Sequence, residues 1–142
     1  MKNIVVLLLL MVSTNVFAEW SRVNTAANGA ITVYVDYETI KRKGNKAEML
    51  SLLNFKTALK YNNDRYLSVT SRVEYNCEEK TDLALDFSFY SGNMKTGDVV
   101  FSTTIKDVKD ETGETDEDET KSISISPGTI NETLFKIACD KR

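Results

Sequence analysis

The sequence predicts an α+β domain: an antiparallel β-sheet of about five to six strands, with one C-terminal helix packed on a face and tethered by a disulfide. Three observations predict it. Segments between residues 31 and 103 alternate apolar and polar side chains and are joined by short links, as antiparallel strands are. The apolar period becomes helical after Pro127-Gly128. The two cysteines, Cys77 and Cys139, fall in a strand and at the helix end.

The first 18 residues predict a signal peptide. Lys2 gives a positive start, nine apolar residues run from Ile4 to Val12, and Val16-Phe17-Ala18 predicts cleavage between Ala18 and Glu19. The apolar run is shorter than the ~20 residues that a membrane-spanning helix needs. We therefore expect residues 19–142 to form one exported domain without a transmembrane segment.

The first predicted strands lie on either side of a charged turn. Residues 31–37 alternate and carry β-branched and aromatic side chains, which favours a strand. Residues 41–46 contain four basic residues around Gly44-Asn45 and predict a turn. Residues 47–56 carry apolar side chains at both odd and even positions, which predicts a strand buried on both faces, although a short helix also fits.

The next strands predict a hairpin. Residues 66–77 alternate regularly, so Cys77 points inward with Val73 and Tyr75. In residues 82–90, Leu83, Leu85, Phe87 and Phe89 are expected to share one face. The link 78–81 is short enough for an antiparallel pair. Residues 98–103 predict another strand, and residues 122–126 a last short one.

A helix follows the Pro-Gly turn. Thr129 fits an N-cap with Glu132 three residues later, which is a capping box. Ile130, Leu134, Ile137 and Ala138 recur at helical spacing, so the helix ends near Cys139.

The cysteine pair favours a structural disulfide, because only one intramolecular pairing exists and exported proteins meet an oxidising environment. A pair of metal thiolates and a redox couple are the alternatives. Ligands 62 positions apart without histidine fit zinc poorly, and redox pairs are usually close in sequence.

Charge and composition favour a binding protein over an enzyme. The chain has no histidine, which removes the commonest general base, so we expect no catalytic residue, metal site or cofactor site. Residues 107–120 hold eight acidic residues and one lysine and predict a solvated loop. Lys41, Arg42 and Lys43 are candidate partner-binding residues, because clustered cations can steer an encounter with an anionic partner. The alternative for these three residues is a solvated hairpin turn.

Several short motifs follow one another along the chain. They are Ala18-Glu19-Trp20, Tyr34-Val35-Asp36, Thr39-Ile40, Gly44-Asn45, Glu74 to Glu79, Tyr90 to Met94, Gly97, Val99-Val100, Pro127 to Ile130 and Lys136 to Cys139. Together, in this order, they resemble the surface-adhesin protein E family of small exported bacterial proteins. Family members usually carry a basic residue where this chain has Thr81-Asp82, and a Trp where it has the acidic block. The lipid-attachment cysteine of the family's namesake is also missing.

The resemblance implies a non-enzymatic adhesin in the periplasm, at the outer membrane or at the cell surface of a bacterium. It implies adhesion to host matrix and serum proteins such as vitronectin and laminin, with haem as a possible ligand. The alternative function is a periplasmic carrier of a small, haem-type ligand or an enzyme inhibitor. We expect no nucleic-acid partner.

Overall fold

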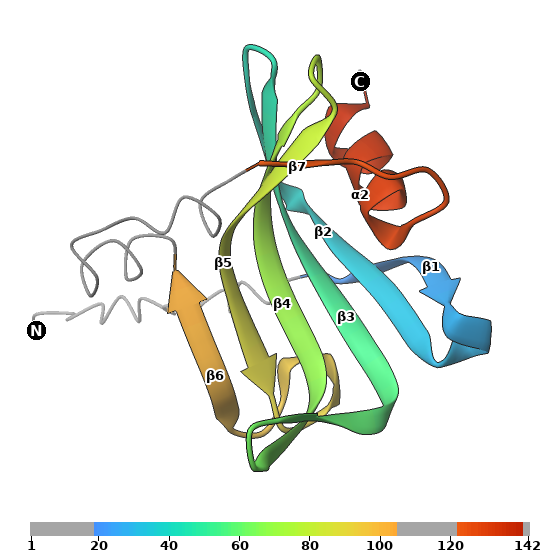
Figure 1. Ribbon diagram of the computed structural model, residues 1–142, viewed down its shortest axis with the longest axis vertical. Helices are drawn as coiled ribbons and strands as arrows, with labels where there is room; N and C mark the ends of the chain where they lie inside the picture. The colour runs from blue at the N-terminus through green and yellow to red at the C-terminus, as the bar shows by residue number, and fades with distance from the viewer. Residues whose placement is uncertain (1–18, 105–121, 141–142) are drawn as a thin grey trace, which may run out of the picture.

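The computed structural model describes residues 19–104 and 122–140, and within them one antiparallel sheet of seven strands carries an α-helix on one face (Figure 1). Residues 1–18, with the predicted signal peptide and Ala18 of its cleavage site, lie outside the described residues. The predicted acidic loop, residues 107–120, lies outside them as well.

Six strands follow each other in space in the order of the sequence. They are β1 (Ser21–Ala26), β2 (Ile31–Lys43), β3 (Lys46–Tyr61), β4 (Asp64–Asn76), β5 (Thr81–Tyr90) and β6 (Val99–Thr104). A two-residue strand, β7 (Ile123–Ser124), pairs with the first residues of β5. Short 3-10 turns, η1 (Ala27–Gly29) and η2 (Asn93–Lys95), lie between β1 and β2 and between β5 and β6. The predicted fold class is confirmed.

Two differences from the predicted strands have local causes. Strand β1 was not predicted, because its six residues mix polar and apolar types without alternation. Strand β2 continues through residues that we expected in a turn, because β2 and β3 remain paired up to Lys43 and Lys46. The turn itself is only Gly44-Asn45, where Gly44 has a φ of 59° that glycine adopts without strain.

The C-terminal helix α2 (Ile130–Cys139) begins as the sequence predicted. The hydroxyl oxygen of Thr129 accepts a hydrogen bond from the backbone N–H of Glu132 at 3.2 Å. This satisfies one of the N–H groups that the first turn of a helix leaves unpaired. The helix contacts β1, β2, β3 and β4, and Leu134 and Ala138 are its buried residues.

The core lies between α2 and the sheet. Its buried members are Val33, Val35, Ala47, Met49, Tyr75, Leu134 and Ala138. The predicted disulfide joins Cys77, directly after β4, to Cys139, the last residue of α2, with Cα atoms 5.6 Å apart. The disulfide therefore fixes the end of the helix to the sheet, as expected.

The predicted common face of residues 82–90 is wrong. Phe87 and Phe89 lie opposite Ser71 and Val69, on the face that carries α2. The register then shifts between Arg72 and Val73, so that Asp82, rather than Leu83, lies opposite Tyr75 on that face. A β-bulge explains the difference, because one extra residue reverses the alternation beyond it.

Candidate partner-binding surface

The three candidate partner-binding residues, Lys41, Arg42 and Lys43, are divided between the two faces of the sheet. In β2, the register shifts between Asp36 and Lys41, so Arg42 lies opposite Ala47 on the face of α2. Lys41 lies opposite Glu48, and strand alternation places it on the other face, as it does Lys43. The three residues therefore do not form one surface.

Arg42 has a structural contact. One of its guanidinium nitrogens donates a hydrogen bond to the backbone carbonyl of Ala138 at 2.6 Å. Carbonyls in the last turn of a helix have no partner within the helix, and a cation is favourable there. Arg42 thus helps to hold the end of α2, whereas Lys41 and Lys43 are exposed and remain available to a partner.

A second surface was not predicted as a site. Six aromatic rings form a continuous cluster on β3, β4, β5 and β6, which we call the aromatic surface. Its members are Phe55, Tyr61, Tyr66, Phe87, Phe89 and Phe101. Tyr66 stacks on Phe89 with ring centroids 4.5 Å apart, and Tyr61 contacts Phe101 at 4.6 Å. Only Phe55 is buried, and the other five rings are half-buried.

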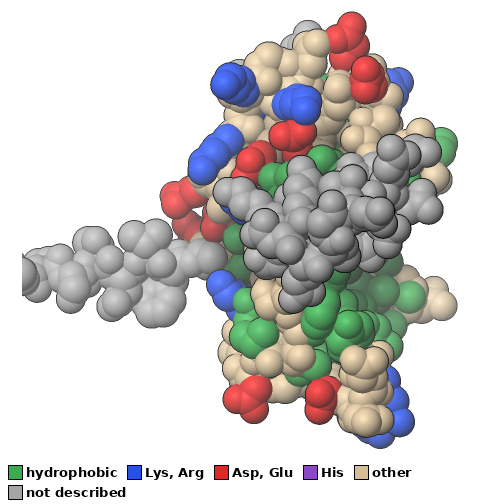
Figure 2. All heavy atoms as spheres, turned by 60° about the vertical axis from the view of Figure 1, so that its left-hand side comes forward, with side chains coloured by type: hydrophobic (Ala, Val, Ile, Leu, Met, Phe, Trp, Pro, Cys, Tyr) green, Lys and Arg blue, Asp and Glu red, His purple; other side chains and the backbone are tan. Residues whose placement is uncertain are grey.

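The aromatic surface is open because α2 is short. The ten residues of α2 span about 15 Å, whereas the 16 residues of β3 extend over about 50 Å. One helix therefore covers only part of this face. Figure 2, seen from the side of β6, shows hydrophobic side chains gathered at the surface over the lower half of the molecule. Alternation along a strand identifies which residues share a face but not what covers that face, so the sequence did not predict this surface.

A rigid loop packs on the opposite face of the sheet, where the side chains of Asn54 and Ser68 point away from the aromatic surface. The amide nitrogen of Asn93 donates to the side-chain oxygen of Asn54 at 3.0 Å and to the carbonyl of Phe55 at 2.9 Å. The fully buried hydroxyl of Ser68 donates to the carbonyl of Gly92 at 2.6 Å and accepts from the N–H of Lys95 at 3.0 Å. These contacts hold Met94 and Lys95 at positive φ, which non-glycine residues adopt only when their surroundings enforce it.

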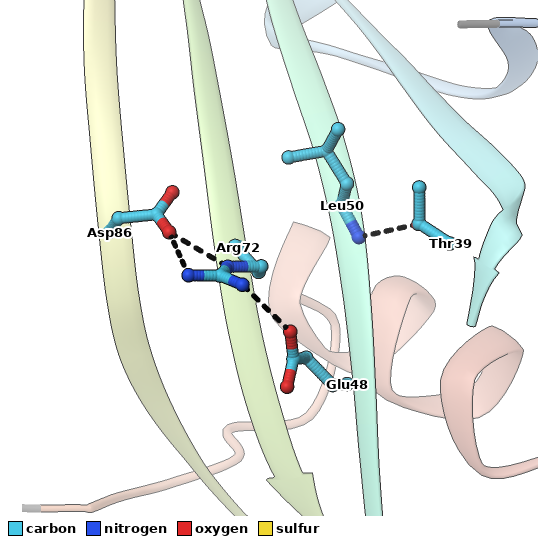
Figure 3. A network of polar contacts seen from close by, with 5 residues as sticks. All are labelled: Thr39, Glu48, Leu50, Arg72 and Asp86. Atoms are coloured by element: carbon cyan, nitrogen blue, oxygen red, sulfur yellow. Dashed lines mark hydrogen bonds and ion pairs between the residues drawn. The ribbon is translucent and has the colours of Figure 1, made fainter. Parts of the chain in front are cut away.

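The opposite face carries ion pairs instead of a cleft. Arg72 lies between Asp86, at 2.6 Å, and Glu48, at 3.2 Å (Figure 3). Lys46 pairs with Glu74 at 2.8 Å, and the hydrogen bond that Lys46 donates to the carboxylate of Glu74 raises the pKa of Lys46. Glu74 and Asp86 are half-buried, and each carboxylate is neutralised by its own cation, so the two do not form the acid–base pair that glycoside chemistry uses.

Asp82 is a carboxyl group buried beneath α2. It is 8% exposed and accepts a hydrogen bond from the side-chain amide of Asn131 at 3.0 Å. Burial raises the pKa of Asp82, and burial together with the charge of Asp82 raises the pKa of Tyr75. The residue therefore opposes folding when it is ionised.

We expect Asp82→Asn to raise the melting temperature at pH 7. Because the folded-state pKa is raised, the protonated carboxyl contributes its full stability below the unfolded pKa of about 3.9, and that contribution is lost as the pH rises through the folded pKa. The difference between variant and wild type should thus shrink towards pH 4 in thermal melts. Asp86→Asn, which removes the partner of Arg72, serves as the control and should lower the melting temperature at pH 7. A lower melting temperature for Asp82→Asn than for the wild type at pH 7 would contradict a destabilising effect of ionised Asp82.

The described residues offer little to a metal ion or to haem iron. Within residues 19–104 and 122–140, no three side chains of His, Cys, Asp or Glu lie close enough together to share a metal. Haem iron is usually held by His, Cys, Met or Tyr. The sequence has no His, both cysteines form the disulfide, and Met49 is buried in the core, which leaves Met94 and the tyrosines as the described side chains of these types.

A cavity of about 250 Å³ lies at the end of α2, lined by Tyr37, Ile40, Arg42, Ile137 and Asp140. It is smaller than the roughly 300–1,000 Å³ that is typical of small-molecule sites. Among the described residues, no helix is long and apolar enough to span a lipid bilayer.

Comparison with known proteins identifies relatives over almost the whole domain. The family model described as surface-adhesin protein E matches residues 20–140. A crystal form of Haemophilus influenzae protein E is 18% identical, with a TM-score of 0.55 over 89% of this chain and 91% of that one. A second structure of Haemophilus influenzae protein E is 19% identical, with a TM-score of 0.54 over 89% and 87% of the two chains. No curated protein matches the sequence. At these identities, the structures support the fold alone.

Proposed function

The chain belongs to the surface-adhesin protein E family, and from this membership we propose that it is an exported, non-enzymatic binding protein whose aromatic surface contacts a macromolecular partner. The family is one of bacterial surface adhesins, and a host matrix or serum protein is the partner class that we propose. The observation that carries the proposal is the open cluster of rings. Large contiguous apolar patches are rare on soluble monomers, and aromatic residues are enriched at protein interfaces.

The aromatic surface suits a macromolecule better than a small molecule. Its rings lie on the face of a sheet and contact each other edge to face, tilted or stacked, so they offer area without an enclosing wall. Small-molecule sites usually bury most of their ligand in a cleft.

We expect the double variant Tyr61→Ala/Phe101→Ala to weaken binding to immobilised vitronectin or laminin by about tenfold or more, because truncating aromatic hot spots commonly costs about 2 kcal/mol or more each. Surface plasmon resonance with the purified protein measures this. The matched control is Tyr34→Ala/Tyr90→Ala, which removes two half-buried tyrosines from the opposite face and should leave affinity unchanged. Equal losses in both variants, or no binding of the wild type to either protein or to serum proteins, would contradict the proposal.

The exposed lysines give a second expected outcome. Lys41→Ala/Lys43→Ala should slow association more than it speeds dissociation, and its effect should shrink at physiological salt, where the Debye length is about 8 Å. Arg42 is left intact because its contact with Ala138 is structural. Lys56→Ala/Lys60→Ala, two exposed lysines elsewhere, is the control. If the association rate changes neither with salt nor with the substitution of Lys41 and Lys43, these two lysines do not steer association.

Surface location and the carrier alternative are tested separately. Protease treatment of intact cells should cleave the protein if it is displayed, whereas complete protection would favour a periplasmic role. A haem titration followed by absorbance should show no stoichiometric uptake. Tight uptake would favour the carrier alternative.

A further inference from the structure

Strand β6 forms one edge of the sheet. It is last in the strand order, and β7 pairs only with Thr81 and Asp82, at the far end of β5. Within residues 19–104 and 122–140, no strand lies along the outer side of β6. Figure 1 shows this edge on the side of the molecule away from α2.

The two edges of the sheet differ in their protection. At the other edge, β1 carries the exposed cation Arg22 and has a bulge before Asn24, whose side chain hydrogen-bonds to Thr133 of α2. Charges, bulges and covering elements are the usual means by which sheets prevent further pairing. The sequence of β6, Val-Val-Phe-Ser-Thr-Thr, has no charge, proline or glycine. Its bulge is confined to the start, at Val100, and leaves regular pairing from Phe101 onward.

A strand added to β6 would continue the aromatic surface. Phe101 and Thr103 lie opposite Phe89 and Phe87, on the face of the aromatic rings, whereas Ser102 lies on the opposite face with Ser88. Directly opposed side chains of neighbouring strands are about 5 Å apart. Every second side chain of an added strand would thus pack beside Phe101 and Thr103. An occupant with apolar residues at alternate positions fits this edge.

The charges near β6 favour a basic occupant. Asp98 directly precedes the strand, and Asp64 lies opposite Tyr61, whose ring contacts Phe101. Both aspartates are exposed, and no Lys or Arg among the described residues forms an ion pair with either. The nearest cations in this hairpin are Lys60 and Arg65, which lie opposite each other on neighbouring strands, one position from Tyr61 and Asp64. Alternation directs their side chains to the other face of the hairpin, away from Asp64.

From this juxtaposition we propose that β6 is the docking edge for an extended segment of the protein partner, which adds as a further strand. The segment alternates apolar and polar residues and carries a Lys or Arg beside Asp98 and Asp64. Main-chain hydrogen bonds to β6 and side-chain packing on Phe101 together provide the recognition. This inference rests on the proposed function, because it specifies how the partner engages the same surface.

The test uses the synthetic peptide acetyl-Lys-Val-Thr-Val-Thr-Val-Thr-Lys-amide and two versions of it that are N-methylated on alternate residues. In an added strand, every second peptide N–H faces β6. We therefore expect one N-methylated version to bind about tenfold more weakly than the parent and the other to bind like the parent. Hydrogen exchange should show new protection confined to the amides of β6. Equal affinity of all three peptides, or no protection in β6, would overturn the proposal.

Proline variants give a check on the protein itself. N–H groups of neighbouring strand residues point in opposite directions, so of Ser102→Pro and Thr103→Pro only the one whose N–H faces outward should keep the wild-type melting temperature. That variant should lose peptide binding. The control is Thr25→Pro on the other edge strand, β1, which should keep peptide binding. The wild-type N–H of Thr25 donates to the side-chain oxygen of Asn24. Retained binding by the folded β6 variant would overturn the proposal.

The outcomes separate this inference from the proposed function. If the wild type binds a matrix or serum protein but the peptide neither binds nor protects β6, the function stands and the docking edge is wrong. If a dimer forms in sedimentation experiments and the β6 proline abolishes it, the edge pairs with a second copy, and the proposal is overturned.

Discussion

Replacing both cysteines, as Cys77→Ala/Cys139→Ala, is expected to lower the free energy of unfolding by about 2–5 kcal/mol. The disulfide closes a loop of 62 positions, for which the chain-entropy model gives roughly 4 kcal/mol. The helix that it holds has only ten residues, fewer than the roughly 12–15 at which isolated helices become even marginal in water. Loss of the bond should therefore release the end of α2 as well as loosen the unfolded chain.

Urea unfolding followed by circular dichroism measures the change, with the wild type under reducing conditions as a second form of the same experiment. The reductant should destabilise the wild type and leave the double variant unchanged, which is the control for non-specific effects. Equal unfolding midpoints for the oxidised and reduced wild type would show that helix packing alone fixes α2.

Truncating the central residue of the helix interface, Leu134→Ala, is expected to lower the free energy of unfolding of the wild type by about 2–5 kcal/mol, because it removes buried contacts and leaves a cavity. Leu134 is 4% exposed and belongs to the core cluster with Met49 and Tyr75. Ile123→Ala is the matched control, since Ile123 is 67% exposed in β7 and its truncation should change stability by no more than about 0.5 kcal/mol.

The two effects should not be additive. Leu134 and the disulfide both hold α2 against the same sheet, and residues that share one packing unit usually couple. In the cysteine-free background, where the helix is already loosened, Leu134→Ala should cost less than in the wild type. A full additive cost would mean that α2 remains docked without the disulfide. A near-zero cost in the wild type would mean that this core contributes little to stability.

The sequence by itself determined the elements and the tether. Alternation identified β2, β4 and β5, because side-chain direction along a strand depends only on local backbone geometry. The apolar run of β3 also fitted a short helix, and its pairing with β2 and β4 shows that it is a strand. Thr129 and Glu132 marked the start of α2, since capping is completed within one turn of chain. Cys77 and Cys139 left only one intramolecular pairing, and the structure confirms it.

The tertiary structure decided which faces these elements present. The register shift in β2 turned Arg42 towards α2 and left Lys41 and Lys43 on the other face, and the bulge in β5 placed Asp82 in the helix interface. Counting residues along a strand fails beyond a bulge, because one extra residue exchanges the two faces.

The aromatic surface depended on the tertiary structure in a different way. Phe87, Phe89 and Phe101 have the alternation of core residues, and they are only half-buried because α2 ends before it reaches them. Periodicity reports that one side of a strand is apolar. Whether that side is buried depends on whether a second layer reaches it, and a helix of about 15 Å does not cover strands of up to about 50 Å.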